Sequence, residues 1–345
     1  MRRSKLQVVD IFSGCGGTSS GLRAAGFDIK VGLDNDEYAA ATFRRNFPEA
    51  RFIESDIKHV KPEEVAALLD SRPVLMAGCA PCQPFSRQNR SRTQGDPRRQ
   101  LLTYFQNFVE VICPDLVLVE NVPGAQNPSS SGPFERFVRK LESWGYGVTV
   151  GVLRACDYGV AQERKRLVIA AAKGATPTLP APQTESRTTV RSAIGGLPPI
   201  AAGETHDSDP DHAAMKLHPQ NLARIAATPE GGGRLDWPAE LQLECHKYHL
   251  GHSDVYGRMR WDDIASGLTT RCLSYSNGRF GHPDQDRAIS LREAALIQSF
   301  PADFKFCGPL TEKGRQVGNA VPPLMAKALG ESLALTLNSR KRKVG

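Results

Sequence analysis

Cys82 and Glu120 are the two side chains whose chemistry and placement together suggest an active site. Cys82 lies between two prolines in the sequence Pro-Cys-Gln-Pro, directly behind the apolar residues 74–77 and Gly78. The prolines restrict the backbone and so fix the position of the thiol, as is expected of a catalytic nucleophile. A second apolar run, residues 116–119, ends in Glu120. Because ligands of parallel sheets bind beyond the carboxyl ends of the strands, we expect the thiol and the carboxyl group at one rim.

Cys79 and Cys82 also form a Cys-x-x-Cys pair, which is typical of redox centres and of half a zinc site. The sequence has no second such pair. Pro81 and Pro84 predict a rigid loop here, whereas a thioredoxin-like pair would open a helix. We therefore favour a nucleophilic role for Cys82 over a redox or metal role.

The N-terminal residues predict a nucleoside-binding turn. Residues 8–12 read as a buried strand that runs into residues 13–17, Ser-Gly-Cys-Gly-Gly, and then into a helical pattern. Glycine lets a ligand approach the backbone closely, and the start of the helix offers free N–H groups. The expected next strand, residues 29–33, ends in Asp34, which is spaced like the acid that accepts hydrogen bonds from ribose hydroxyls.

The third expected strand, near residues 51–54, ends close to Asp56 and Ile57. Asp56 could accept a hydrogen bond from an adenine amine, and Ile57 could cover the ring. These residues fit an adenosine group without choosing between a dinucleotide and S-adenosylmethionine. The glycine pattern is not Gly-x-Gly-x-x-Gly, and acids suit a positive sulfonium better than a pyrophosphate, so we favour S-adenosylmethionine.

In its sequence motifs, the chain resembles the C5-cytosine-specific DNA methyltransferases of bacterial type. The family's blocks occur in order as Asp10-Ile11-Phe12-Ser13-Gly14-Cys15-Gly16-Gly17, Pro81-Cys82-Gln83-Pro84, Glu120-Asn121-Val122, Gln162-Glu163-Arg164-Lys165-Arg166 and Gly318-Asn319-Ala320-Val321-Pro322-Pro323. Together they span nearly the whole chain. The Pro-Cys-Gln and Gln-x-Arg-x-Arg blocks are specific in combination.

The resemblance implies a fold and a set of site residues. The fold is α/β, a doubly wound, mostly parallel sheet of the S-adenosylmethionine-dependent methyltransferase type, with a smaller, mostly β or irregular target-recognition domain. The catalytic residues would be Cys82, Glu120, Arg164 and Arg166. The cofactor residues would be Asp10, Phe12, Gly14, Cys15, Gly16, Gly17, Asp34, Asn35, Asp56, Ile57, Gly78, Leu101, Asn319 and Val321. Some relatives have an aromatic ring where this chain has Asn35.

The implied chemistry explains these residue types. The Cys82 thiolate adds to C6 of cytosine, which makes C5 nucleophilic toward a methyl group, while Glu120 neutralises the charge that develops at N3. Arg164 and Arg166 supply positive field for the thiolate and, by the resemblance, reach the cytosine O2 and a phosphate. The alternative for these arginines is a purely structural one, in which they are charged residues that precede the expected strand at residues 167–172. No metal or redox cofactor is required.

A cytosine inside a duplex cannot present C6 to a thiol, so the mechanism implies base flipping. Residues 85–100 are polar and basic and lack an apolar period. We predict a mobile loop that closes over the DNA. The residues predicted to contact DNA are Ser86, Gln88, Arg98, Gln162, Arg258, Arg260, Thr269 and Arg271.

The strand and helix alternation stops near residue 172, where prolines become frequent. We predict a catalytic and cofactor-binding domain over residues 1–173, a target-recognition domain over 174–284 and a return to the catalytic domain over 285–345. A last helix, residues 322–337, should pack on the first domain. Residues 268–271 are expected on a strand. Basic and aromatic residues expected to lie against DNA include Lys247, Tyr248, Tyr256, Arg258, Arg260, Trp261, Arg271 and Tyr275.

Composition agrees with this function. The net charge of +7 suits a polyanion partner, here double-stranded DNA. Eight cysteines without regular spacing indicate a reducing, cytoplasmic location, and no segment resembles a membrane span or a signal peptide. We expect a monomer in which a cognate restriction endonuclease of the same system is not a required subunit.

Two other functions stay open from the sequence. A tRNA cytosine methyltransferase of the same superfamily would share the chemistry, but the interval between Arg166 and Arg258 is long enough for a DNA-reading domain. A catalytically idle DNA-binding relative would not need the whole catalytic set. The recognition sequence is not fixed by spacing. The group Cys245, His246, His249 and His252 is more simply a chance cluster than a metal site.

Overall fold

The computed structural model of the chain describes residues 6–79, 100–123, 132–183, 187–247 and 254–344, with backbone alone for 246–247 and 340–344. The chain forms two compact units. Unit 1 comprises Met1–Tyr158, Lys165–Gln183 and Val321–Gly345. Unit 2 comprises Gly159–Arg164 and Thr184–Ala320.

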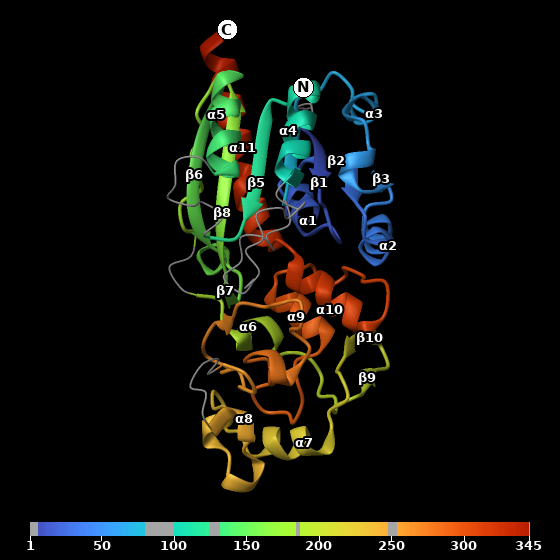
Figure 1. Cartoon of the computed structure of the whole chain (residues 1–345), viewed down its shortest axis with the longest axis vertical. Coiled ribbons are helices and arrows are strands. Elements are labelled where there is room, and N and C mark those ends of the chain that lie inside the picture. Colours follow the sequence, from blue (N-terminus) through green and yellow to red (C-terminus); the bar gives the residue numbers. More distant parts are fainter. Residues whose placement is uncertain (1–5, 80–99, 124–131, 184–186, 248–253, 345) are drawn as a thin grey trace. The chain divides into compact units, whose positions relative to one another are not determined.

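Unit 1 is built on a seven-stranded sheet with strand order β3-β2-β1-β4-β5-β8-β6 (Figure 1). Strands β3, β2, β1, β4 and β5 run parallel, and β8 is antiparallel to both β5 and β6. The large, mostly parallel sheet confirms the predicted α/β class. The strands are β1 (Gln7–Ile11), β2 (Asp28–Asp34), β3 (Arg51–Glu54), β4 (Val74–Gly78), β5 (Leu116–Asn121), β6 (Tyr146–Arg154) and β8 (Lys165–Lys173).

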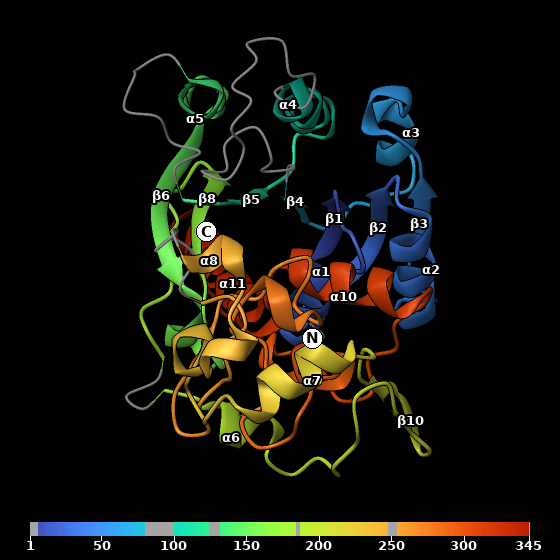
Figure 2. The same ribbon diagram turned by 60° about the horizontal axis from the view of Figure 1, so that its bottom comes forward.

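Helices cover both faces of this sheet (Figure 2). One face carries α1 (Gly17–Ala24), α2 (Glu37–Asn46) and α11 (Pro323–Val344), and the other carries α3 (Pro62–Ala66), α4 (Leu101–Ile112) and α5 (Pro133–Ser143). The short helices η1 (Ile57–His59) and η3 (Ala155–Tyr158) complete unit 1. Because both faces are covered, β1, β4 and β5 are mostly apolar and are buried along their whole length.

The predicted return of the last helix to the first domain is confirmed. Helix α11 packs against α1 where Gly21 lies so close that a Cβ on it would approach the Pro323 carbonyl oxygen to 2.2 Å. Gly330 makes a similar approach to Leu22. The helix continues to Val344, beyond the predicted end near residue 337, because residues 331–344 contain neither glycine nor proline.

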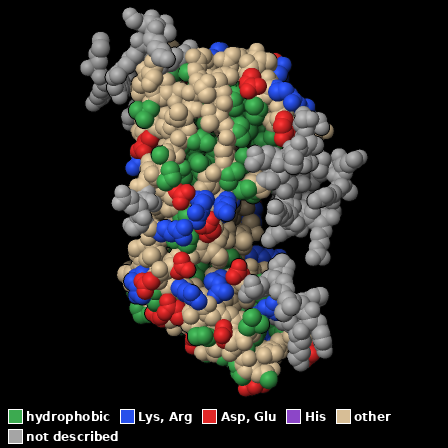
Figure 3. Space-filling view, turned by 90° about the vertical axis from the view of Figure 1, so that its left-hand side faces the viewer, with side chains coloured by type: hydrophobic (Ala, Val, Ile, Leu, Met, Phe, Trp, Pro, Cys, Tyr) green, Lys and Arg blue, Asp and Glu red, His purple; other side chains and the backbone are tan. Residues whose placement is uncertain are grey.

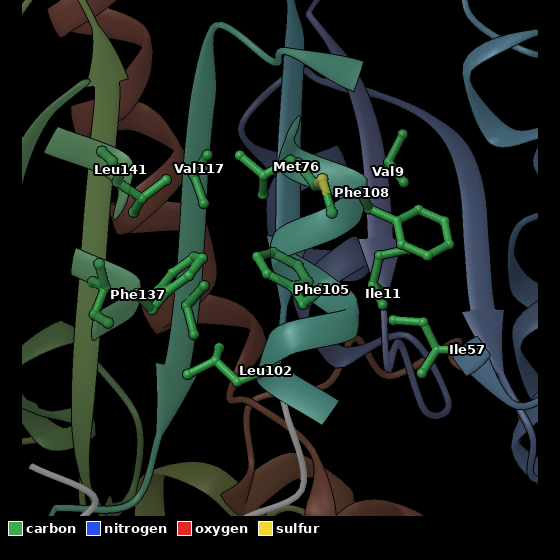
Figure 4. Packing of buried hydrophobic residues seen from close by; sticks show 14 of the residues in the cluster. Val9, Ile11, Ile57, Met76, Leu102, Phe105, Phe108, Val117, Phe137 and Leu141 are labelled. Atoms are coloured by element: carbon green, nitrogen blue, oxygen red, sulfur yellow. The ribbon is translucent and has the colours of Figure 1, made fainter. Parts of the chain in front are cut away.

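A hydrophobic core fills the space between the sheet and helices α3, α4 and α5 (Figure 4). Val9, Ile11 and Met76 project from the strands, and Phe105 and Phe108 project from α4. All five side chains are at most 2% exposed. Burial of this kind stabilises a domain by about 2 kcal/mol per large side chain.

Strand β6 forms one edge of the sheet. Residues 175–179 cover one of its faces, since a Cβ on Gly147 would meet the Ala175 carbonyl oxygen at 2.4 Å. On the other face, Val150 and Val152 are each 44% exposed. Figure 3 draws the side of unit 1 formed by α5 and β6, where hydrophobic side chains lie at the surface among charged ones.

The second domain was predicted to be mostly β or irregular, and unit 2 is irregular with little β structure. Its described part has two ladders of two short strands, β7 (Gln162–Glu163) with β11 (Ala265–Ser266), and β9 (Thr205–His206) with β10 (Asp209–Ala213). The rest is loops and helices of at most ten residues, in a part of the sequence where prolines and glycines are frequent. The helices are α6 (Val190–Ile194), α7 (Pro219–Ala226), α8 (Glu244–Lys247), α9 (Leu291–Ile297), α10 (Leu310–Asn319), η4 (Arg234–Asp236), η5 (Ala239–Leu241) and η6 (Tyr275–Asn277).

The units divide differently from the predicted boundaries at residues 174 and 284. Unit 2 extends to Ala320, and the return to unit 1 begins at Val321. Helix α9 packs on α6, β10 and α10, all of which belong to unit 2. The predicted helical period at residues 290–299 is confirmed by α9. Among the described helices, none is long and apolar enough to cross a membrane.

The aromatic residues of unit 2 form a core. Tyr275 is 1% exposed and Trp237 is 4% exposed, and they cluster with Ile225 and Leu217. Tyr256 stacks edge-on against both rings. The expectation that Tyr275 faces DNA is wrong because its ring is buried in this core. Tyr256 is partly exposed, and its contact with DNA stays a prediction.

A buried polar network crosses the start of α9. Glu293 accepts from the Arg287 guanidinium at 2.7 and 2.8 Å and from the Ser290 backbone N–H at 2.7 Å. The His282 ring lies 3.6 Å from Glu293 and its Nδ1 accepts from the backbone N–H groups of Asp284 and Gln285. Burial lowers the pKa of His282 to about 4, although Glu293 opposes this shift.

We expect His282 to make the protein sensitive to acid. The pKa of His282 is lowered from the ordinary value of 6.5 to about 4 in the folded state, so protons bind more readily to the unfolded chain. The contribution of neutral His282 to the free energy of unfolding is therefore complete above pH 6.5 and is lost as the pH falls toward 4. The loss should approach about 3 kcal/mol of the free energy of unfolding. Denaturant unfolding across this window measures it, with His282→Gln as the control that cannot gain a proton. An equal acid loss in both proteins would contradict the assignment.

Candidate active site at the carboxyl ends of the strands

The turn after β1 is shaped by glycine. Gly14 and Gly16 have φ of 52° and 96°. Gly16 is the N-cap of α1, which begins at Gly17. A Cβ on Gly16 would approach the Phe47 ring to 2.5 Å, so this position has no room for a side chain. Phe12 also has a positive φ, 59°. The turn therefore brings the N-terminus of α1 to the carboxyl end of β1, and Gly16 and Gly17 are themselves buried there. The predicted succession of strand, glycine turn and helix is confirmed.

Asp34 ties this turn to the end of β2. Its Oδ2 accepts from the Gly14 backbone N–H at 2.8 Å, and its Oδ1 accepts from the Asp36 N–H at 3.1 Å. Burial raises the pKa of Asp34, and these N–H donors counteract the shift only in part. A cation or a hydroxyl donor next to Asp34 would be favourable, since its described hydrogen-bond donors are neutral amides.

Asp10 and Cys15 lie inside the molecule. The Ser19 hydroxyl donates to Asp10 Oδ2 at 2.7 Å, which fixes α1 to β1. Burial raises the pKa of Asp10 to about 7 and that of the Cys15 thiol to about 12. Their exposed fractions are 1% and 3%. The geometry favours a supporting role for both side chains beneath the turn.

The third strand ends as predicted, but its two candidate residues differ in surroundings. Asp56 is partly exposed and pairs with Lys58, whose Nζ lies 3.1 Å from Oδ2. Although burial raises the pKa of Asp56, the hydrogen bonds from Lys58 outweigh it and the pKa is lowered. Ile57 is 2% exposed and belongs to the core in Figure 4. Asn35 is exposed, and Leu101 begins α4.

Glu120 is held by two side chains at the end of β5. The Cys79 thiol donates to Oε2 at 2.9 Å, and Arg166 Nε lies 2.5 Å from Oε1. Glu120 is 5% exposed. Sequence reasoning missed Cys79 as a partner of Glu120. The parallel register that pairs Gly78 with Val119 is the signal that could have found it, because the next residues on the two strands are Cys79 and Glu120.

Arg164 and Arg166 occupy different environments. Arg166 reaches Glu120 in unit 1. Arg164 is 5% exposed in unit 2, where its guanidinium donates to the carbonyls of Leu268, Gly318 and Ala320 at 2.7, 2.9 and 3.1 Å. The geometry favours a structural role for Arg164, since buried guanidinium groups require several acceptors.

The residues predicted to contact DNA separate into buried and exposed groups. Gln162 is fully buried and its Oε1 accepts from the Leu268 N–H, so it holds unit 2 together. Arg258 is 4% exposed and donates to four backbone carbonyls as well as to Asp286. These two predictions are corrected, because neither side chain reaches the surface. Arg260, Thr269 and Arg271 are exposed.

The prediction of a strand at residues 268–271 is wrong. The Thr269 carbonyl accepts from the Cys272 N–H, and the Arg271 carbonyl accepts from the Ser274 N–H, which makes consecutive turns. Gly318 packs against this backbone, with its would-be Cβ 2.0 Å from the Thr269 oxygen. Asn319 follows as the exposed last residue of α10 in unit 2, and Val321 is buried in unit 1.

Several predicted residues lie outside the described part of the chain, namely Cys82, Ser86, Gln88 and Arg98, as do Tyr248, His249 and His252. Gly78 is described, and its would-be Cβ meets the Phe105 ring at 2.4 Å. Within the described ranges, no group of His, Cys, Asp and Glu side chains is arranged to hold a metal ion.

A family model for the C-5 cytosine-specific DNA methylases matches residues 6–334. The chain belongs to this family. The Type II methylase M.HgiDII of Herpetosiphon aurantiacus is 43% identical to this methylase over 335 residues, which are 94% of each chain. The Type II methyltransferase M1.HphI of Haemophilus parahaemolyticus is 33% identical and covers 97% of the methylase and 88% of its own length.

A solved structure of a putative DNA modification methyltransferase encoded within a prophage (E. coli) resembles this methylase with a TM-score of 0.77. It is 25% identical, and the match covers 97% of the methylase and 100% of that chain. The methylase therefore has the fold of methyltransferases across nearly its whole length. These comparisons confirm the enzyme class that the sequence motifs predicted.

The glycine turn of the methylase gives a stability prediction. Gly16→Ala should lower the free energy of unfolding by about 2 kcal/mol or more, because a left-handed backbone costs about 1 kcal/mol and the new Cβ also meets Phe47. Gly14→Ala is the matched control, since it has φ of 52° but nothing within 4 Å of its Cβ. Denaturant unfolding compares the two variants. Equal losses would mean that Phe47 does not restrict the turn.

Proposed function

We propose that this methylase transfers the methyl group of S-adenosylmethionine to C5 of a cytosine in a specific double-stranded DNA sequence. The observation that carries the proposal is the Glu120 carboxyl group, which is 5% exposed and held at 2.5 Å from Arg166 at the carboxyl end of β5. A carboxyl fixed at this rim is the group that attack on cytosine requires at N3. The names of the Type II relatives agree with modification within a restriction system.

The residues at the ends of β1, β2 and β3 fit S-adenosylmethionine. The turn at Gly14 and Gly16 places the N-terminus of α1 at the end of β1, and the raised pKa of Asp34 reflects a desolvated carboxyl group that a ribose donor or a nearby cation would stabilise. Phe12, Asn35, Asp56 and Leu101 border the same strand ends, and Asn319 and Val321 are assigned by the family motif. When bound, S-adenosylmethionine supplies the electrophilic methyl group.

Cys82 and Glu120 act on the cytosine ring. The Cys82 thiolate adds to C6 while Glu120 donates a proton to N3, so that the ring gains no net negative charge. C5 then attacks the methyl carbon, whose bond to the sulfonium sulfur breaks, so that S-adenosylhomocysteine is the leaving group. A base removes the C5 proton, Cys82 departs from C6 with the bonding electron pair, and N3 returns its proton to Glu120, which restores the aromatic ring and the free enzyme. Arg166 orients Glu120 and supplies positive charge at the rim.

The substrate cytosine must leave the duplex to reach these groups. Ser86, Gln88 and Arg98 are proposed to contact the DNA around the vacated position. In unit 2, Arg260, Thr269 and Arg271 are exposed and can contact DNA, and Arg271 and Arg260 carry the positive charge that phosphates attract. We propose unit 2 as the target-recognition domain of a monomeric, cytoplasmic enzyme that does not require a nuclease subunit.

Methyl transfer to nucleic acid tests the function directly. Labelled S-adenosylmethionine is incubated with unmethylated duplex DNA and, separately, with tRNA, and the nucleosides of each product are separated. We expect 5-methylcytosine in DNA, none after Cys82→Ser because the attacking thiol is lost, and about 100-fold slower transfer after Glu120→Gln. Label in tRNA alone, or in neither, would overturn the proposal.

The exposed and buried arginines of unit 2 predict opposite phenotypes. Arg271→Ala should weaken DNA binding and reduce the dependence of binding on salt concentration, with unchanged thermal stability, because it removes one exposed phosphate partner. Arg258→Ala should destabilise the protein by about 3 kcal/mol, because carbonyls and Asp286 lose their buried partner. Binding titrations and denaturant unfolding check both. If Arg258→Ala retained full stability, its buried role would be contradicted.

A further inference from the structure

Cys79 leaves its strand beside Glu120. Strands β4 and β5 are parallel and pair Gly78 with Val119, so the following residues, Cys79 and Glu120, are neighbours on the same face of the sheet. The end of β4 is fixed because Gly78 packs against the Phe105 ring, where a Cβ would come within 2.4 Å. The backbone at the end of β4 therefore sets the position of the Cys79 side chain.

The two oxygens of Glu120 have different partners. The Cys79 thiol donates to Oε2 at 2.9 Å, and Arg166 Nε lies 2.5 Å from Oε1. Val168 on β8 is paired with Glu120 on β5. Arg166 lies two residues from Val168 along β8, on the same face of the sheet, so its side chain can reach Glu120. Each oxygen of the Glu120 carboxyl group is therefore contacted from a different side of β5. The carboxyl group cannot rotate about the Cγ–Cδ bond without breaking one of these contacts.

We propose that Cys79 is a positioning residue, whose thiol orients the Glu120 carboxyl group toward N3 of the flipped cytosine. This inference rests on the proposed function, in which Glu120 acts at N3. It gives the Cys-x-x-Cys pair a non-redox explanation, in which Cys82 attacks the base and Cys79 aligns the acid. A thiol suits this task because it is a weak donor, which fixes the direction of the Glu120 carboxyl group without binding it tightly.

The proposal predicts a loss in the chemical step alone. Cys79→Ala should lower the single-turnover rate of methyl transfer about tenfold, the loss expected for one hydrogen bond to an acidic group, with KM for S-adenosylmethionine and for DNA changed less than about twofold. Cys79→Ser retains a donor and should recover part of the rate. Cys113→Ala is the matched control, because that thiol is exposed at the end of α4 and donates to the Glu110 carbonyl.

A spectroscopic measurement tests the contact without using activity. The S–H stretching band of Cys79, assigned by its absence in Cys79→Ala, should be displaced by hydrogen bonding in the wild-type protein and should move in Glu120→Ala. Thermal unfolding of each variant separates misfolding from misalignment, and Cys79→Ser remains informative if the alanine variant unfolds.

The outcomes separate the two claims. An active wild-type enzyme with an unchanged rate in Cys79→Ala, or an S–H band that ignores the loss of Glu120, would overturn the role of Cys79 alone. A rise in KM with an unchanged single-turnover rate would equally overturn it, because positioning acts on chemistry. A wild-type enzyme that methylates no cytosine would overturn the proposed function, and this role with it.

Discussion

The parallel register of β2, β1, β4 and β5 is the constraint on which the site depends. Parallel strands place all their carboxyl ends at one edge of the sheet. Asp34, Cys79 and Glu120 each follow or close a strand at this edge, although they are far apart in the sequence. A shift of one residue between β4 and β5 would turn Cys79 to the opposite face from Glu120, so register and chemistry are coupled here.

The acids of unit 1 show how one fold gives similar groups different properties. Asp10 is buried with one hydroxyl donor and has a pKa of about 7, whereas Asp56 is partly exposed beside Lys58 and its pKa is lowered. Asp34 lies between these cases, with N–H donors that only partly offset its burial. Burial and the charge of the partner decide the difference, because all three are aspartates.

Positive charge in unit 2 serves structure as much as surface. Arg164, Arg258 and Arg287 are each at most 5% exposed and donate to backbone carbonyls. A unit made of loops leaves many carbonyls without partners in regular ladders, and a buried guanidinium can satisfy several of them at once. The net charge of +7 therefore overstates the charge that DNA can meet.

The sequence by itself determined six of the strands of unit 1, its first and last helices, the glycine turn and the acids at the strand ends, because apolar runs, turn residues and motifs are local signals. It also determined the family, whose blocks lie along the whole chain. Only the tertiary structure decided which arginines are buried, that Cys79 contacts Glu120 and that residues 268–271 form turns. Those outcomes depend on packing between segments distant in sequence, such as Gly318 against Thr269, and an irregular unit has no period from which to infer them.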